Sequence, residues 1–296
     1  MKTYSIVIRV LATILVFFQC SILHAACFSP LANPKSSDPN DWQDLLSFSP
    51  TTTNPEVIEI QQLKSGSSDN VNLDYYSYTF RRHPSKTIQD VFLYMRKKFP
   101  MYAKGGRVDS GQYFLPYRKS AGPDETQKTN EKVWLSSNPN GALMSFVLAT
   151  LQPVLTLHAT LGTLKPVLEQ GDVLVTCASD LDFIFTTVRT IKDDWHPVSG
   201  NRGFGLRDNG NGTWTFFTKA TDRAAPYIGV TLDKAVVRAF NLANPFSKNA
   251  PDADDHIFQL GHEFWLRFFE TMIDDLGKQN MELIESTVNS RRYPYK

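Results

Sequence analysis

Alternating apolar and polar positions dominate one stretch in the second half of the chain. Asp172–Cys177 and Leu181–Arg189 alternate with a period of two, and the short polar turn between them predicts a hairpin. Gly203–Arg207 and Thr213–Thr221 repeat the pattern on either side of Asp208–Gly212, a run typical of tight turns. We expect an antiparallel meander with one aromatic face, formed by Phe183, Phe185, Phe204, Trp214 and Phe216.

A strand and a helix are predicted before this meander. Val71–Phe80 alternates, with Tyr76 and Tyr78 on one face. Apolar positions then recur every three or four residues, as in a helix that Ser85 or Thr87 would cap: Ile88, Val91, Phe92 and Met95. We expect this helix to end before Pro100, because proline lacks the amide hydrogen that a helix interior needs.

A second apolar segment, Ala142–Leu151, follows Asn140, whose side chain can cap a helix, and stops at Pro153. Val154–Leu161 then alternates and contains the polar His158. Together the two pieces nearly reach the length of a membrane span. Proline and histidine are costly in lipid, so we expect a buried element of a globular domain here.

The chain is predicted to end in a long helix over Asp252–Gly277. Acidic residues at its start suit the helix dipole. Two adjacent rows recur with helical spacing: Ile257, Leu260, Phe264, Phe268, Met272 and Leu276 form one, and Phe258, His262, Trp265, Phe269 and Ile273 the other. Such a wide apolar face needs a curved partner surface. Gly261 within it permits close approach of another backbone or marks a kink.

Two polar stretches interrupt these elements. Residues 27–70 are rich in Ser, Thr, Asn and Pro and predict an irregular lead-in, in which Val57–Leu63 is a short strand or arm. Lys119–Glu131 contains Gly122-Pro123 among charged residues and predicts an exposed loop.

The first 26 residues have the pattern of a secretory signal peptide. Lys2 and Arg9 precede the apolar run Val10–Leu23, which is short for a membrane span and is followed by the small residues Ala25 and Ala26. We therefore expect a secreted or periplasmic protein. A retained membrane anchor is the alternative.

Cys27 directly follows this segment, at the position of the acylated cysteine of a bacterial lipoprotein. His24 departs from the usual leucine three residues before such a cysteine. A disulfide to Cys177 is the other option in an oxidising compartment. Since Cys177 lies within an alternating strand, we favour a buried structural thiol there.

The amino-acid composition limits the classes of function that this protein can have. The 296 residues are 42% hydrophobic, which is enough for a sizeable core. The 31 basic residues nearly cancel the 30 acidic ones, so no overall field favours nucleic acid or an anionic membrane. We expect no nucleic-acid partner, and membrane attachment only through lipidation at Cys27.

The order of elements resembles the helix-grip superfamily of Bet v 1-like and START-like proteins. Within it, Trp195-His-Pro-Val-Ser-Gly-Asn-Arg-Gly-Phe204, Gly212-Thr213 and Asp222-Arg223 are similar to paired strands of some uncharacterised bacterial members. The resemblance covers roughly residues 71–279 and implies an α+β fold, in which a curved antiparallel sheet packs on the long C-terminal helix with a hydrophobic cavity between them. Residues 71–296 would form this domain, with an insertion around 105–170.

Catalytic motifs are weak. Asp194 and His196 lie near each other on a predicted loop and suit acid–base chemistry, although their spacing matches no triad. His256 and His262 are spaced wrongly for a helical metal pair, which needs three or four residues. We expect no metal and no cofactor, because phosphate-binding loops and paired Cys-x-x-Cys motifs are absent.

The sequence therefore predicts a protein that binds a lipid-like or other apolar small molecule between sheet and helix. We expect the ligand to contact the aromatic sheet face and two residues of the helix. The sheet residues are Phe183, Phe185, Phe204, Trp214 and Phe216, and the helix residues are His262 and Trp265. A packed core without a pocket is the competing interpretation, as in an envelope interaction protein. A cyclase- or hydrolase-type enzyme centred on His196 and Asp194 is the other.

Overall fold

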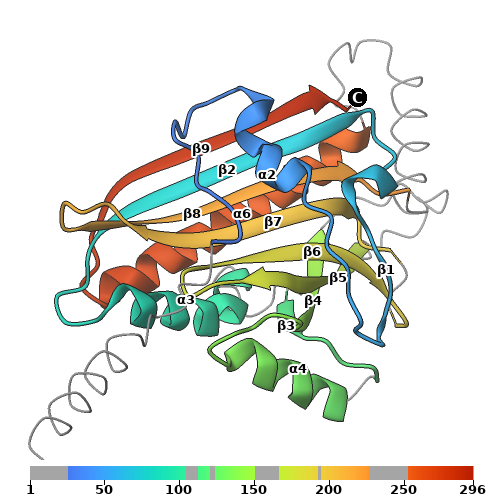
Figure 1. Ribbon diagram of the computed structural model, residues 1–296, viewed down its shortest axis with the longest axis horizontal. Helices are drawn as coiled ribbons and strands as arrows, with labels where there is room; N and C mark the ends of the chain where they lie inside the picture. Colours follow the sequence, from blue (N-terminus) through green and yellow to red (C-terminus); the bar gives the residue numbers. More distant parts are fainter. Residues whose placement is uncertain are drawn as a thin grey trace, which may run out of the picture.

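An antiparallel sheet, backed by helices on one face, organises the structure (Figure 1). The computed structural model describes residues 26–104, 113–120, 124–150, 167–192, 195–226 and 253–295. Within them the sheet order is β3-β4-β5-β6-β7-β8-β2-β9, and β1 pairs with β6. The strands are β1 Val57–Ile60, β2 Asn70–Arg81, β3 Tyr113–Pro116, β4 Leu143–Thr150, β5 Val167–Ala178, β6 Asp182–Thr190, β7 Val198–Asp208, β8 Thr213–Ala224 and β9 Leu283–Pro294.

Two long helices cover one face of the sheet. They are α3 (Ile88–Ala103) and α6 (Ala253–Lys278); Figure 1 shows α6 running behind the strands and α3 beside it. The shorter elements are η1 Pro39–Trp42, α2 Gln43–Leu46, η2 Leu63–Ser65 and α4 Glu125–Leu135. The α+β class, the antiparallel meander β5 to β8 and the long C-terminal helix are as the sequence predicted, and the curved sheet against a C-terminal helix is consistent with a helix-grip architecture.

The face toward α3 and α6 is the aromatic one, called here the helix face. The predicted aromatic residues of the meander all lie in the core cluster of this face: Phe183, Phe185, Phe204, Trp214 and Phe216. Tyr76 and Tyr78 of β2 join them, whereas Tyr75 belongs to a separate cluster on the opposite face. The alternation in sequence therefore assigned the two faces correctly.

Phe99 of α3 occupies the centre of this core. Its ring lies 4.6–6.4 Å, centroid to centroid, from the rings of Phe114, Trp134, Phe183, Phe185, Phe204, Trp265 and Phe268. These rings come from strands β3, β6 and β7 and from helices α4 and α6. The buried Phe99 side chain of α3 therefore packs against the sheet and against two other helices.

Three predicted boundaries or elements are wrong. Helix α3 continues through Pro100 to Ala103, because Phe99, Tyr102 and Ala103 are buried and their packing outweighs the lost backbone hydrogen bond. Residues 125–135 of the expected loop region form α4, which Asp124 caps by accepting a hydrogen bond from the Gln127 amide.

The segment after Asn140 is a strand, β4, and not a capped helix. Gly141 has a φ of 84°, which turns the chain directly into the ladder with β5. The last residue of the predicted segment, Val154–Leu161 and His158 lie outside the described residues. The prediction of burial holds for Leu143 and Met144.

The lead-in covers the sheet face opposite the helices (Figure 1). Phe28, Leu31, Trp42 and Leu45 are buried there against strand residues. Lys219 of β8, 1% exposed, donates hydrogen bonds to the carbonyls of Ser29 and Asp41 and to the Asp44 carboxylate at 2.8–3.1 Å. The lead-in is therefore an integral covering layer, although most of it is irregular, as predicted.

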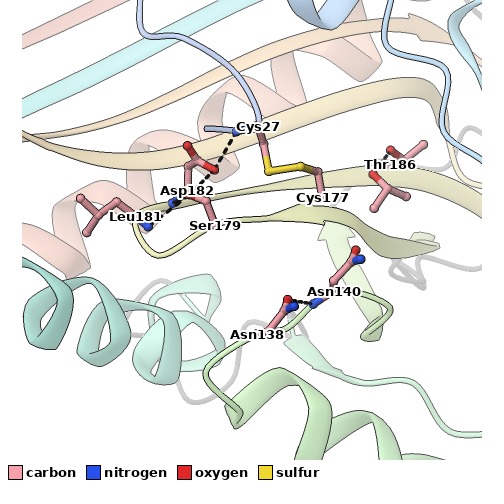
Figure 2. Close-up of a disulfide and its surroundings, with 9 residues drawn as sticks. Cys27, Asn138, Asn140, Cys177, Ser179, Leu181, Asp182 and Thr186 are labelled. Carbon is pink, nitrogen blue, oxygen red and sulfur yellow. Dashed lines mark hydrogen bonds between the residues drawn. A yellow bond between two sulfur atoms is a disulfide. The ribbon is translucent and has the colours of Figure 1, made fainter. Parts of the chain in front are cut away.

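A disulfide joins the lead-in to β5 (Figure 2). Cys27 and Cys177 are bonded across a sequence separation of 150, and the Cys27 amide donates to the Asp182 carboxylate at 3.1 Å. The preference for a free structural thiol at Cys177 was wrong, because its side chain emerges on the face that the lead-in covers. A thioether-linked lipid at Cys27 would need the same sulfur, so lipidation and this bond exclude each other.

Candidate functional site

A cavity of about 120 Å³ lies between the first half of α6 and the helix face of the sheet. Its apolar wall combines side chains from both layers: Phe146, Val173 and Phe185 from β4 to β6, and Phe258, Phe264 and Trp265 from α6. Gly261 of α6 also lines it. A Cβ atom built on Gly261 meets nothing within 4 Å, so a missing side chain helps to keep this space open.

The opposite wall is polar and charged. Asn72 and Asp74 of β2, Arg202 of β7 and Asp222 of β8 all line the cavity. The register places them on the helix face, since Asn72 pairs with Asp222 and Arg202 is opposite Ala220 beside them. The helix face thus changes along its strands from aromatic at one end to charged at the other.

Hydrogen bonds tie this polar wall together. Arg202 Nη2 donates to Asp74 Oδ2 at 2.9 Å, and Asn72 Nδ2 donates to the same oxygen at 3.0 Å. Asn72 Nδ2 also lies 3.2 Å from Asp222 Oδ1. One amide therefore bridges two buried carboxylates, which holds them close to each other.

The electrostatics of the two carboxylates differ. Burial, and then repulsion from Asp74, raise the pKa of Asp222 to about 7, against opposing attraction from Arg202 and Arg292. Asp74 instead has a direct ion pair with Arg202, whose guanidinium also stacks 4.5 Å from the Trp265 ring centroid. A pair of carboxylates in unequal environments is the arrangement that acid–base sites use.

Several buried polar atoms on this wall lack a hydrogen-bond partner among the described residues. They are Asp74 Oδ1, Arg202 Nη1 and His196 Nε2. Asp74 is 3% exposed and His196 5% exposed. Unpaired polar atoms at such depth cost free energy unless something polar enters the cavity to meet them.

His196 is wedged into the cavity wall. Its ring packs edge-on against Phe146, with centroids 4.7 Å apart, and its Nδ1 lies 2.8 Å from the Val198 carbonyl oxygen. A Cβ atom on Gly171 would come within 2.4 Å of the ring, so only glycine fits beneath it. Burial lowers the pKa of His196 to about 3, which keeps the imidazole neutral near pH 7.

This burial predicts acid sensitivity. The unfolded chain takes up a proton at His196 below about pH 6.5 that the folded protein excludes until about pH 3. The contribution of the neutral His196 imidazole to the free energy of unfolding is therefore fully present above pH 6.5. It falls by about 1.4 kcal/mol for each pH unit below that value. We expect urea unfolding between pH 6.5 and 4 to show a shallower pH slope for His196→Gln than for the wild type. Equal slopes would contradict a buried neutral imidazole.

The structure separates the predicted site residues into three groups. Phe185 and Trp265 line the cavity. His262 is partly exposed and hydrogen-bonds through Nδ1 to the Tyr76 hydroxyl at 2.7 Å, outside the cavity lining. The remaining aromatic residues lie in the packed core instead of the cavity wall: Phe183, Phe204, Trp214 and Phe216.

His196 of the proposed enzymatic pair lines the cavity, whereas Asp194 lies outside the described residues. The sequence offered Arg202, with Arg207 and Arg223, as positive charge for a substrate anion, and Arg202 does line the cavity, but sequence reasoning missed Asn72, Asp74 and Asp222. The alternation along β2 could have revealed two of them. Asn72 and Asp74 lie on the same face as Tyr76 and Tyr78, and a fully packed core would require apolar side chains at those positions.

Across the described ranges, no three potential metal-ligating side chains of His, Cys, Asp or Glu are grouped as a metal site would need. In the same part of the chain, none of the helices has both the length and the apolarity required to cross a membrane.

Comparisons with known proteins include a distant likeness to a solved structure. No family model and no curated protein matches the chain. Among solved structures, the di-domain ARO/CYC StfQ from the steffimycin biosynthetic pathway is similar, with a TM-score of 0.34 and 8% sequence identity. The match covers 68% of this chain and spans about half, 49%, of that chain.

Proposed function

We propose that this protein binds an apolar or amphipathic small molecule in the cavity between α6 and the sheet. The observation that carries the proposal is the cavity itself, about 120 Å³ with an apolar wall and a small set of polar groups facing it. A cavity of about 150 Å³ in another protein suffices for benzene. The described space therefore suits a ligand portion of about one ring.

The contrast with the rest of the helix face supports this proposal. Where α3 covers the sheet, the rings around Phe99 pack so closely that the space beside them is only about 10 Å³. The larger cavity occurs where α6 covers the sheet with Gly261. A single core thus has a filled end and an open end, which favours a carrier over an interaction protein without a pocket.

We further propose a secreted or periplasmic location. The pattern of the first 26 residues is that of a signal peptide, and the Cys27–Cys177 disulfide suits an oxidising compartment. N-terminal sequencing of the protein secreted or exported by its host would test this location. Recovery only from the cytoplasm with residue 1 retained would contradict it.

Filling the cavity should abolish binding without loss of the fold. Gly261→Phe places a ring into open space, and glycine is a poor helix former, so the helix tolerates the change. We expect fluorobenzene, followed by ¹⁹F NMR titration, to bind the wild type and to bind Gly261→Phe at least tenfold more weakly.

Gly277→Phe is the matched control for this experiment. Gly277 lies in the same helix, is exposed and is absent from the cavity lining, and its Cβ direction is also free. Its fluorobenzene affinity should stay within twofold of wild type. If folded Gly261→Phe binds as well as the control, the cavity is not the binding site.

A cyclase- or hydrolase-type activity centred on His196 and Asp194 is the second candidate, favoured by the unpaired Nε2 of His196 in the cavity wall. The lowered pKa of His196 makes the imidazole a poor proton acceptor near neutral pH. The carrier role is therefore the better supported of the two.

A further inference from the structure

The charged wall of the cavity has features that binding of an apolar molecule does not need. Burying Asp74, Arg202 and Asp222 beside an apolar space costs solvation free energy. Purely apolar residues would serve a simple carrier better at the same positions.

We propose that the Asp222–Asp74–Arg202 cluster makes the cavity a proton-transfer site, which moves a proton between two carbons of a small cyclic ketone. The proposal rests on the proposed function, because it places its substrate in the same cavity. It assigns Asp222 as the group that takes up and returns the proton. Arg202 stabilises the negative charge that develops on the ketone oxygen.

The geometry supports these separate roles. Asp74 Oδ2 accepts hydrogen bonds from Arg202 Nη2 and Asn72 Nδ2. Asp222 forms no ion pair with Arg202 within the described residues, and its carboxylate accepts from Asn72 Nδ2. Arg202 Nη1 is a buried donor without a partner. It is thus free to donate to a ketone or enolate oxygen in a site of low polarity, where such a bond is strong.

The charged groups around Asp222 come from three strands. Asp74 on β2 repels its charge, while Arg202 on β7 and Arg292 on β9 attract it. The α6 side contributes the apolar ring of Phe258, over which the Arg292 guanidinium lies at 4.4 Å. The resulting pKa of about 7 leaves both protonation states populated at neutral pH, which a group that accepts and then donates a proton requires.

The reaction balances without a co-reactant. With 3-cyclohexenone, the Asp222 carboxylate removes a proton from C2 and the electron pair delocalises onto the ketone oxygen as a dienolate. The protonated Asp222 then gives the same proton to C4, which forms 2-cyclohexenone. One C–H bond breaks and one forms, and nothing is oxidised. The single ring suits a cavity of about 120 Å³.

The test uses the purified full chain and 3-cyclohexenone, with the ultraviolet absorbance of the conjugated product as readout. We expect the wild type to accelerate isomerisation above buffer, with a rate that rises as pH increases through about 7. Asp222→Asn should lower the protein-dependent rate at least 100-fold. Glu285→Gln, which removes an exposed carboxylate on β9, should leave it unchanged.

Fluorobenzene binding separates the two proposals. Asp222→Asn that still binds fluorobenzene but has lost isomerisation supports proton transfer. A wild type that binds fluorobenzene without isomerising the ketone, or an Asp222→Asn variant of wild-type rate, overturns proton transfer and leaves the carrier function intact. If Asp222→Asn fails to fold, a wild-type rate that does not change between pH 5.5 and 8.5 overturns the role of Asp222.

Discussion

Replacing Cys27 and Cys177 by serine is expected to lower the free energy of unfolding by up to about 5 kcal/mol. The bond closes a loop with a sequence separation of 150 residues. Cross-linking so long a loop removes much of the conformational freedom of the unfolded chain. It also fixes the start of the lead-in against β5, beside Asp182, as seen in Figure 2.

Urea unfolding with and without reductant measures this effect. The wild type should lose stability on reduction, and the double serine variant should be insensitive to the reductant. A wild-type midpoint that reductant does not move would show that the bond adds no stability. Since the lead-in covers a whole sheet face, its release should also increase hydrogen exchange at Lys219 and its neighbours on β8.

The second large effect is expected for Phe99→Ala, at about 3–5 kcal/mol of lost unfolding free energy. Phe99 is 3% exposed and contacts rings from β3, β6, β7, α4 and α6. Its removal leaves a cavity that neighbours on several separate elements cannot all move to fill.

Met101→Ala is the matched control, because Met101 lies on the same helix but is 38% exposed. Its cost should stay within about 0.5 kcal/mol. Chemical denaturation of both variants gives the comparison. A loss below about 1 kcal/mol for Phe99→Ala would mean that the aromatic cluster repacks around the gap, and that its close fit is not essential.

Elements whose side chains follow a regular period were predictable from the sequence. Aromatic side chains recur at every second position along β6 to β8, although β6 and β8 are buried on both faces, and apolar residues recur with helical spacing along α6. Strand β9 left no such signal. Most of its side chains are exposed, including Ile284 and Val288, and its backbone ladder with β2 holds it in the sheet together with a few side chains such as Asn289, which donates to the Pro34 and Ser36 carbonyls.

The candidate site was predictable only in part. The sequence placed Phe185 and Trp265 on facing surfaces, but it could not tell a filled gap from an open one. That difference depends on which helix covers which end of the strands. At the aromatic end α3 supplies Phe99, and at the charged end α6 supplies Gly261. Neither arrangement can be predicted from the spacing of apolar residues within a single strand or helix.

The position of β2 inside the sheet constrains how the chain folds during synthesis. Leu73 pairs with Thr221 of β8 on one side and with Arg291 of β9 on the other. The ribosome must therefore add about 150 residues after Leu73 before its partner on β8 is available, and β9 comes later still; such distant pairings are slow to form. Until β8 has been synthesised, the tyrosines of β2 stay exposed, so we expect the nascent protein to depend on a holding chaperone.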